Sequence, residues 1–202
     1  MVSVHDFVDA LNAQARENSW PARCDATLAF EEPQLAFFVQ TWQSQLRGRD
    51  MPARSDMTVR LLKHQLHRIM LLERVEEEGK ERRYRVRLMA SGLANIWGDM
   101  TGQYLDEVIP PHLLPRWHGF SDTVLYVQQP LRFTAQVEFQ GKNFLVAELA
   151  VVPLSDDDGR PNMVMTAIHT SGDRSWEVAM ARYDGIHTKR QRRIEAVRTV
   201  AS

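Results

Sequence analysis

The side chains that could carry chemistry in this chain are histidines, a run of aspartates and a single cysteine. The seven histidines stand at positions 5, 64, 67, 112, 118, 169 and 187. They form neither a His-Glu-x-x-His pattern nor a Cys/His cluster of the kind that binds zinc. The aspartates at 156–158 lack the alternate oxygen ligands and the late glutamate of a calcium loop, and they are typical of a turn. The sequence therefore predicts no metal site, and we expect that the protein is not an enzyme.

The stretch 87–104 organises the chain, and it contains three widely spaced glycines, Gly92, Gly98 and Gly102. Their spacing is too wide to cradle a pyrophosphate, and the chain has neither a phosphate loop nor a nucleophile elbow. Residues 84–89 alternate between apolar and polar side chains, which indicates a strand. From residue 91 the apolar positions recur at helical spacing, and Gly98 is typical of a helix end. The stretch is thus expected to be a strand that passes into short helices.

Two amphipathic helices are predicted before this stretch. The first covers 3–15, where Ser3 and Asp6 resemble a capping box, and the second begins at Pro33. Residues 16–27 between them are expected to form a loop. The apolar stripes of the two helices either pack on the rest of the domain or serve dimerisation, and both alternatives stay open. Residues 46–56, with three arginines and two aspartates, are either a salt-bridged connector or an anion-binding rim.

The strands and the remaining helix are predicted from their hydrophobic periodicity. Residues 69–75 and 84–89 are expected to pair antiparallel across a charged hairpin loop. A long helix from 112 to 127 follows, with Leu113, Trp117, Phe120, Val124 and Val127 at helical spacing. Three further strands are expected at 131–139, 144–153 and 163–169. The sequence thus predicts five strands.

The composition describes one ordinary domain. Of the 202 residues 44% are hydrophobic and 25% are charged, which is typical of a globular chain. The formal net charge of −1 provides no whole-chain attraction to nucleic acid or anionic lipid. A single cysteine, Cys24, allows no intramolecular disulfide, and no apolar run approaches the ~20 residues of a membrane span, so we expect a cytoplasmic location. The basic cluster at 187–193 is either solvated or an arm for an anionic partner.

The order of these elements and several short motifs resemble the alphaproteobacterial PAS-like family called PAS_5. The motifs are Trp42, Leu46-Arg47-Gly48, Pro52-Ala53-Arg54-Ser55-Asp56, Arg87-Leu88-Met89-Ala90-Ser91 and Ile96-Trp97-Gly98-Asp99-Met100-Thr101-Gly102. They resemble the family's aromatic-Trp helix, its Pro-x-Arg-x-Asp element, the Arg-Leu-x-Gly-Thr end of its second strand and an aromatic-Gly element closed by Thr-Gly. Ala90 stands where the family usually has Gly, and Thr58 where a Pro often follows, so the chain resembles a divergent member. The resemblance covers about 35–170.

The resemblance implies an α+β fold: a PAS-like five-stranded antiparallel sheet with helices over one face, plus N-terminal amphipathic helices. It divides the chain into an N-terminal helical extension at 1–34, a PAS-like sensory domain at 35–172 and a basic C-terminal tail at 173–202. The motif residues expected to have structural roles are Trp42, Pro52, Arg54, Asp56, Gly98 and Gly102.

The same resemblance implies an apolar pocket between the sheet and the helices. The candidate ligand-binding residues are Arg87 as a polar anchor, with Ser91, Trp97, Tyr104, Trp117 and Phe133. In the alternative interpretation the aromatic side chains fill the core, and Arg87 is buried against a carboxylate such as Asp99 or Glu107. PAS domains can carry haem or flavin, and His112 and His118 lie on the helix that would supply a haem ligand, but neither cofactor is required here.

The function implied is that of a stand-alone sensory or adaptor protein that binds a small ligand, a protein partner or both, and signals by docking. We expect a homodimer through the N-terminal helices, a possible signalling protein partner, and no binding to membranes or nucleic acid. The alternatives are a small enzyme that uses the pocket, with Arg87 and His118 as the residues to suspect, and an anion- or nucleic-acid-binding protein that uses the basic tail.

Overall fold

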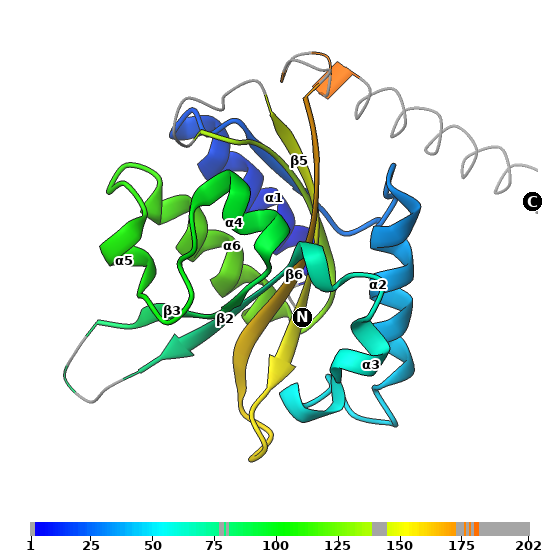
Figure 1. The fold of residues 1–202 in the computed structure, drawn as a ribbon. Coiled ribbons are helices and arrows are strands. Elements are labelled where there is room, and N and C mark those ends of the chain that lie inside the picture. The colour runs from blue at the N-terminus through cyan, green and yellow to red at the C-terminus, as the bar shows by residue number, and fades with distance from the viewer. Residues whose placement is uncertain are drawn as a thin grey trace, which may run out of the picture.

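The part of the chain that the structure describes folds into one antiparallel sheet of six strands, with helices on both faces (Figure 1). The computed structural model describes residues 3–76, 79, 81–138 and 145–172, and residues 176, 178, 180 and 181. The strands are β1 (Ala22–Asp25), β2 (Ile69–Val75), β3 (Arg83–Met89), β4 (Leu131–Gln136), β5 (Val146–Ser155) and β6 (Pro161–Ser171), in the order β1-β4-β5-β6-β2-β3. The helices are α1 (Val4–Glu17), α2 (Pro33–Ser44), α3 (Val59–Leu62), α4 (Ser91–Trp97), α5 (Leu105–Val108) and α6 (Leu114–Val127).

The predicted PAS-like α+β fold is confirmed, but the sheet has one strand more than the five expected. The additional strand is β1, which lies within the residues 16–27 that were expected to form a loop, and it pairs antiparallel with β4. The side-chain amide of Asn12 on α1 holds the middle of β1: it donates to the carbonyl oxygen of Cys24 and accepts from its N–H, both at 2.9 Å. This four-residue strand is therefore stabilised by partners that are distant in the sequence.

Helix α1 begins at the predicted capping box. The N–H of Asp6 donates to the hydroxyl oxygen of Ser3 at 3.3 Å, and the N–H of Ser3 donates to the carboxylate of Asp6 at 2.7 Å. The helix packs on α6 and β1 and buries Val8 and Leu11. The apolar stripe of α1 is therefore used within the chain.

Helix α2 covers the opposite face of the sheet from α4, α5 and α6 (Figure 1). Its predicted stripe is buried, and Leu35, Phe38 and Trp42 pack against residues of β5 and β6. The indole N–H of Trp42 donates to the carbonyl oxygen of Pro153 at 2.8 Å. The second N-terminal helix therefore packs its apolar stripe on the sheet.

A buried group of three ionic side chains, which we call the Arg132 triad, ties the segment before α2 to the sheet. Arg132 on β4 lies 2.7 Å from the carboxylate of Glu148 on β5 and 3.2 Å from that of Asp25 on β1. The three residues are 2%, 8% and 4% exposed. Glu148 also accepts hydrogen bonds from the backbone N–H groups of Glu31 and Glu32, each at 2.9 Å. The triad therefore fixes where the chain enters α2.

Helices α4, α5 and α6 form the layer on the other face, and the segment 98–104 between α4 and α5 runs along β3. The N–H of Val86 donates to the carbonyl oxygen of Gln103 at 2.9 Å, and the N–H of Gly102 donates to that of Val86 at 2.7 Å. Gly98 and Gly102 have φ angles of 81° and 85°, which favour glycine over other residues. The two motif glycines therefore let this segment cover the edge strand before the helical layer continues.

Candidate functional site

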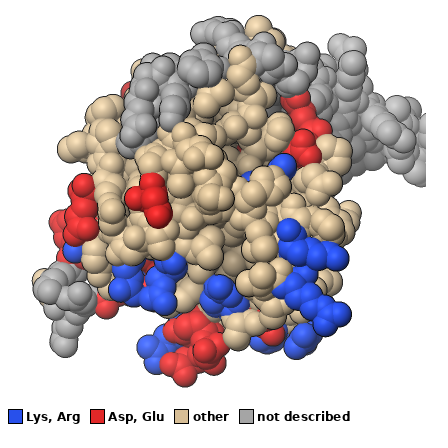
Figure 2. Space-filling view, viewed as in Figure 1, with Lys and Arg blue, Asp and Glu red and all other residues tan. Residues whose placement is uncertain are grey.

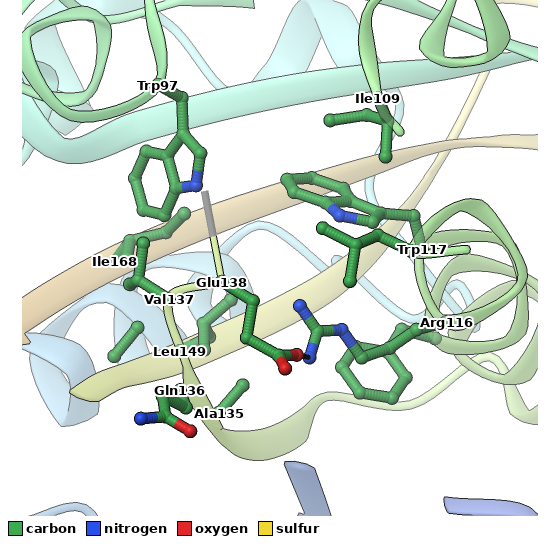
Figure 3. A pocket seen from close by; sticks show the side chains of 13 residues that line it. Trp97, Ile109, Arg116, Trp117, Ala135, Gln136, Val137, Glu138, Leu149 and Ile168 are labelled. Carbon is green, nitrogen blue, oxygen red and sulfur yellow. Dashed lines mark hydrogen bonds and ion pairs between the residues drawn. The ribbon is translucent and has the colours of Figure 1, made fainter. Parts of the chain in front are cut away.

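A cavity lies between the sheet and the helical layer (Figure 3). Its volume is about 70 Å³, whereas pockets for drug-sized ligands span roughly 300–1,000 Å³. Trp97, at the end of α4, and Trp117, on α6, lie on two sides of it (Figure 3). The other apolar walls are made by Ile109, Leu113, Phe120, Ala135, Val137, Ala147, Leu149 and Ile168. The cavity is therefore small and mainly apolar.

The polar part of the wall consists of an ion pair between Arg116 and Glu138, together with Gln136. The Nη1 atom of Arg116 donates to Glu138 Oε2 at 2.6 Å, and Figure 3 shows the guanidinium pointing at the carboxylate. The Arg116 side chain is 7% exposed and that of Glu138 is 31% exposed. Burial lowers the pKa of Arg116, and the nearby carboxylate opposes this effect. An arginine nevertheless stays charged near neutral pH, so the wall holds a buried cation beside a partly exposed anion.

Two of the predicted ligand-binding residues, Trp97 and Trp117, line the cavity, and Phe133 lies behind its wall. Phe133 is fully buried on β4, and its ring stacks on that of Phe120 with the centroids 4.5 Å apart. Phe120 itself lines the cavity. The aromatic side chains thus divide between lining the cavity and filling the core, which were the two alternatives left open by the sequence.

The prediction that Arg87 anchors the cavity is wrong. The pairing of β2 with β3 shifts by one residue, and Arg87 is the extra residue at this β-bulge. Its side chain is 47% exposed and lies 3.3 Å from Glu73. The alternative, that Arg87 is buried against Asp99 or Glu107, is wrong for the same reason. Arg116 provides the buried cation that was expected of Arg87.

Tyr104 and Ser91 also lie outside the cavity walls. The guanidinium of Arg83 lies over the ring of Tyr104, 3.7 Å from its centroid, so this ring takes part in a surface contact. Ser91 is exposed at the first residue of α4. The predicted meeting of Arg87, Trp97 and Tyr104 around one enclosed space is therefore wrong for two of the three residues.

Sequence reasoning missed both members of the ion pair. Arg116 lies three residues after Leu113 and four before Phe120, so it shares the apolar stripe of α6. A cation on an apolar helix stripe was the signal that could have identified it. Glu138 gave no such signal, because in the sequence it is an ordinary polar residue at the end of a predicted strand. Only the folded chain brings its carboxylate next to Arg116.

The motif residues Trp42, Pro52, Arg54, Asp56, Gly98 and Gly102 are not among those that line the cavity. Asp56 accepts a hydrogen bond from the backbone N–H of Ala53 at 2.9 Å and pairs with Arg49 at 2.6 Å. The hydrogen bond from Arg49 is the largest cause that lowers the pKa of Asp56. Arg54 donates to the carbonyl oxygen of Met57 at 3.2 Å. These contacts are those of a salt-bridged connector, the first of the two alternatives for residues 46–56.

Neither histidine considered as a haem ligand lines the cavity. His112 is exposed, and the His118 ring packs beside Tyr84 with the centroids 5.3 Å apart. Burial lowers the pKa of His118. Among the described residues that line the cavity there is no histidine, cysteine, methionine or tyrosine. These residues and this volume therefore do not fit a haem group.

Surface charges of both signs lie close together. In Figure 2 the Lys and Arg side chains gather in the lower half of the view, near β3 and over α3, with Asp and Glu at the β5–β6 turn. In that turn the carboxylate of Asp156 accepts from the N–H groups of Asp158 and Arg160, as expected of a turn. The basic cluster at 187–193 lies outside the described residues. No helix in the described part of the chain is long and apolar enough to cross a membrane.

The antiparallel sheet, the short helices α4 and α5, the long helix α6 and the cavity beneath them define a sensory or interaction module of the PAS type. The model of the PAS domain family matches residues 30–169, which is well over half of the chain. The chain therefore belongs to the PAS domain family, as its motifs predicted. The match includes α2 and begins after α1 and β1. A comparison with curated proteins found no match.

Proposed function

We propose that this protein is a PAS-type sensory or adaptor protein that takes a small ligand into the cavity and signals by docking to another protein. The observation that carries the proposal is the cavity between Trp97 and Trp117, which has apolar walls and a buried cation, Arg116. Apolar walls with few polar groups are the usual lining of small-molecule sites. A cytoplasmic location, expected from the lone Cys24, belongs to the same proposal.

The proposal is tested by comparing ligand binding to the wild type with binding to a variant whose cavity is filled. Ala147 lines the cavity, so the larger side chain of Ala147→Leu occupies part of its volume. A library of small metabolites is screened by thermal shift, and hits are verified by native mass spectrometry of protein purified from its own host. Ala10→Leu, on the exposed side of α1, is the matched control.

We expect ligands that stabilise the wild type and Ala10→Leu, and that lose this effect in Ala147→Leu. A ligand that stabilises all three proteins equally binds elsewhere and contradicts the proposal. The proposal is also contradicted if the protein carries no ligand from its host and no compound in the library stabilises it. If mass spectrometry instead finds that a bound compound is converted, the enzyme alternative replaces the sensory one.

Homodimerisation through the N-terminal helices stays a prediction. Since α1 and α2 bury their apolar stripes within the chain, such a dimer uses their outer sides, where Phe37 on α2 is 46% exposed. Light scattering during size-exclusion chromatography measures the molar mass of the wild type, of Phe37→Asp and of Gln40→Asp as a control on the same helix. We expect a dimer that Phe37→Asp dissociates and Gln40→Asp leaves intact; a monomeric wild type rejects the prediction.

A further inference from the structure

The two members of the cavity ion pair differ in how easily they can leave it. The Arg116 side chain is 7% exposed and that of Glu138 is 31% exposed. Arg116 belongs to α6, which is anchored by the buried side chains of Val124 and Leu125. Glu138 lies two residues beyond the end of β4, and its carboxylate can turn into solvent. A ligand that enters the wall at this point therefore displaces Glu138 and not Arg116.

A ligand that displaces Glu138 must replace its charge. A buried guanidinium that has lost its carboxylate is strongly unfavourable, because the desolvated cation has no partner. A carboxylate suits this position, since its two oxygens match the two parallel N–H donors of an arginine fork. A cationic ligand would be repelled by Arg116, and a neutral one would leave the pair with Glu138 intact. The charge arrangement thus selects for an anion.

We propose that the cavity binds a short apolar monocarboxylate whose carboxylate replaces that of Glu138 on Arg116 and whose hydrocarbon end lies between Trp97 and Trp117. This assignment rests on the proposed function and adds the chemical class of the ligand. The volume of about 70 Å³ is about half that of the ~150 Å³ apolar cavity that holds benzene, so the hydrocarbon part of the ligand is limited to a few carbons. Glu138 is then an internal competitor that the ligand must displace.

The test compares probes of equal chain length and different charge: butyrate, 1-butanol and n-butylammonium. Binding is followed by the ¹H–¹⁵N signals of the tryptophan indoles, assigned with Trp97→Phe and Trp117→Phe. Butyrate is expected to move both signals saturably and to bind more tightly than butanol, but by less than the roughly tenfold of one charge-assisted contact, because the contact between Glu138 and Arg116 is given up in exchange. The signal of Trp42, on the other face of the sheet, is the internal control. Acetate is expected to bind more weakly than butyrate, and octanoate is expected to be excluded by the cavity volume.

Two substitutions separate the roles of the ion pair. Glu138→Gln removes the competing charge and is expected to tighten butyrate binding by about threefold or more, with no comparable effect on butanol. Arg116→Gln is expected to abolish the preference for butyrate over butanol. If Arg116→Gln does not fold, Arg116→Lys takes its place, because it keeps the charge but not the fork of parallel donors. Arg160→Gln removes an arginine that is 77% exposed and is expected to leave both affinities unchanged.

The ligand class is overturned if butyrate binds no better than butanol, or if Glu138→Gln weakens butyrate binding. That result is distinct from a failure of the proposed function. If butanol moves the signals of Trp97 and Trp117 while butyrate has no advantage, the cavity still takes ligands and only the carboxylate assignment fails. If neither these probes nor any metabolite moves the two signals, the proposed function fails as well.

Discussion

Replacing Arg132 by methionine is expected to destabilise the protein by about 3–5 kcal/mol, because the substitution removes the cation and leaves two carboxylates buried together. Asp25 and Glu148 are only 4% and 8% exposed, and both lie within 3.2 Å of the guanidinium in the wild type. The unfolding free energy of an ordinary domain is about 5–15 kcal/mol, so the expected loss is a large share of the total stability. With a denaturant slope of about 2 kcal/mol per M, the urea midpoint is expected to fall by about 2 M.

The assay is urea unfolding followed by tryptophan fluorescence and by circular dichroism. Arg160→Met is the matched control, because Arg160 and Asp158 are 77% and 76% exposed and their nitrogen and oxygen atoms lie 3.7 Å apart. An exposed pair of this kind contributes little, so the control is expected to change the unfolding free energy by no more than about 0.5 kcal/mol.

A second variant tests whether charge, and not packing, explains the loss. In the triple substitution Asp25→Asn, Arg132→Met and Glu148→Gln no buried charge of the triad remains, and the amide oxygen at position 148 can still accept from the N–H of Glu31 or Glu32. Most of the lost stability should return, since uncharged replacements of buried ion groups are often neutral or stabilising. The reasoning is refuted if Arg132→Met is no worse than Arg160→Met, or if the triple variant is as unstable as the single one.

Three further predictions concern the motif residues. Trp42→Phe removes the indole donor from the carbonyl oxygen of Pro153 and part of a buried side chain, and should cost about 1–3 kcal/mol in urea unfolding; an unchanged midpoint would contradict this role. The pKa of Asp56 is lowered in the folded state, chiefly by Arg49, so its stabilisation is present above the unfolded value of 3.8 and is lost as pH falls through the lower folded pKa. The difference in unfolding free energy between wild type and Asp56→Asn should therefore shrink between about pH 5 and pH 2, and a constant difference would argue against the ion pair. Arg87→Ala should change stability by no more than about 0.5 kcal/mol and leave ligand binding intact, because the Arg87 side chain is 47% exposed and Glu73 keeps its closer ion pair with Arg85, at 2.7 Å; loss of binding in calorimetry would return Arg87 to the site.

The sequence predicted those parts of the fold whose signals are local. The capping box of Ser3 and Asp6, the stripe of α2 and the existence of strand β4 follow from side chains that are close in the sequence, and the structure confirms each of them. Strand β4 ends at Gln136, before the predicted end at residue 139, and it is buried on both faces. Strand β1 was missed because a four-residue run is too short for its alternation of Ala22 and Cys24 with Arg23 and Asp25 to indicate a strand. It becomes a strand only when β4 and the amide of Asn12 pair with its backbone.

The candidate site was predicted less well for a related reason. Alternation along a strand assumes an unbroken register, and the one-residue shift between β2 and β3 makes Arg87 the extra residue of a bulge. The bulge depends on cross-strand pairing that periodicity does not encode. Trp97 and Trp117 were identified because their elements were predicted correctly, whereas the approach of Glu138 to Arg116 joins the end of a strand to a helix.

The covered edges of the sheet restrict how a partner can bind this protein. On β3 the backbone of Val86 is already paired with the segment 98–104, and on β1 the amide of Asn12 occupies the N–H and carbonyl oxygen of Cys24. Many recognition modules bind peptides by adding a strand to an open edge, and the same open edges promote aggregation. At Val86 and Cys24 the backbone groups are already paired, so neither strand addition nor aggregation can use them. A docking partner is therefore expected to recognise side chains on the helices, and a synthetic β-strand peptide should not bind along either edge.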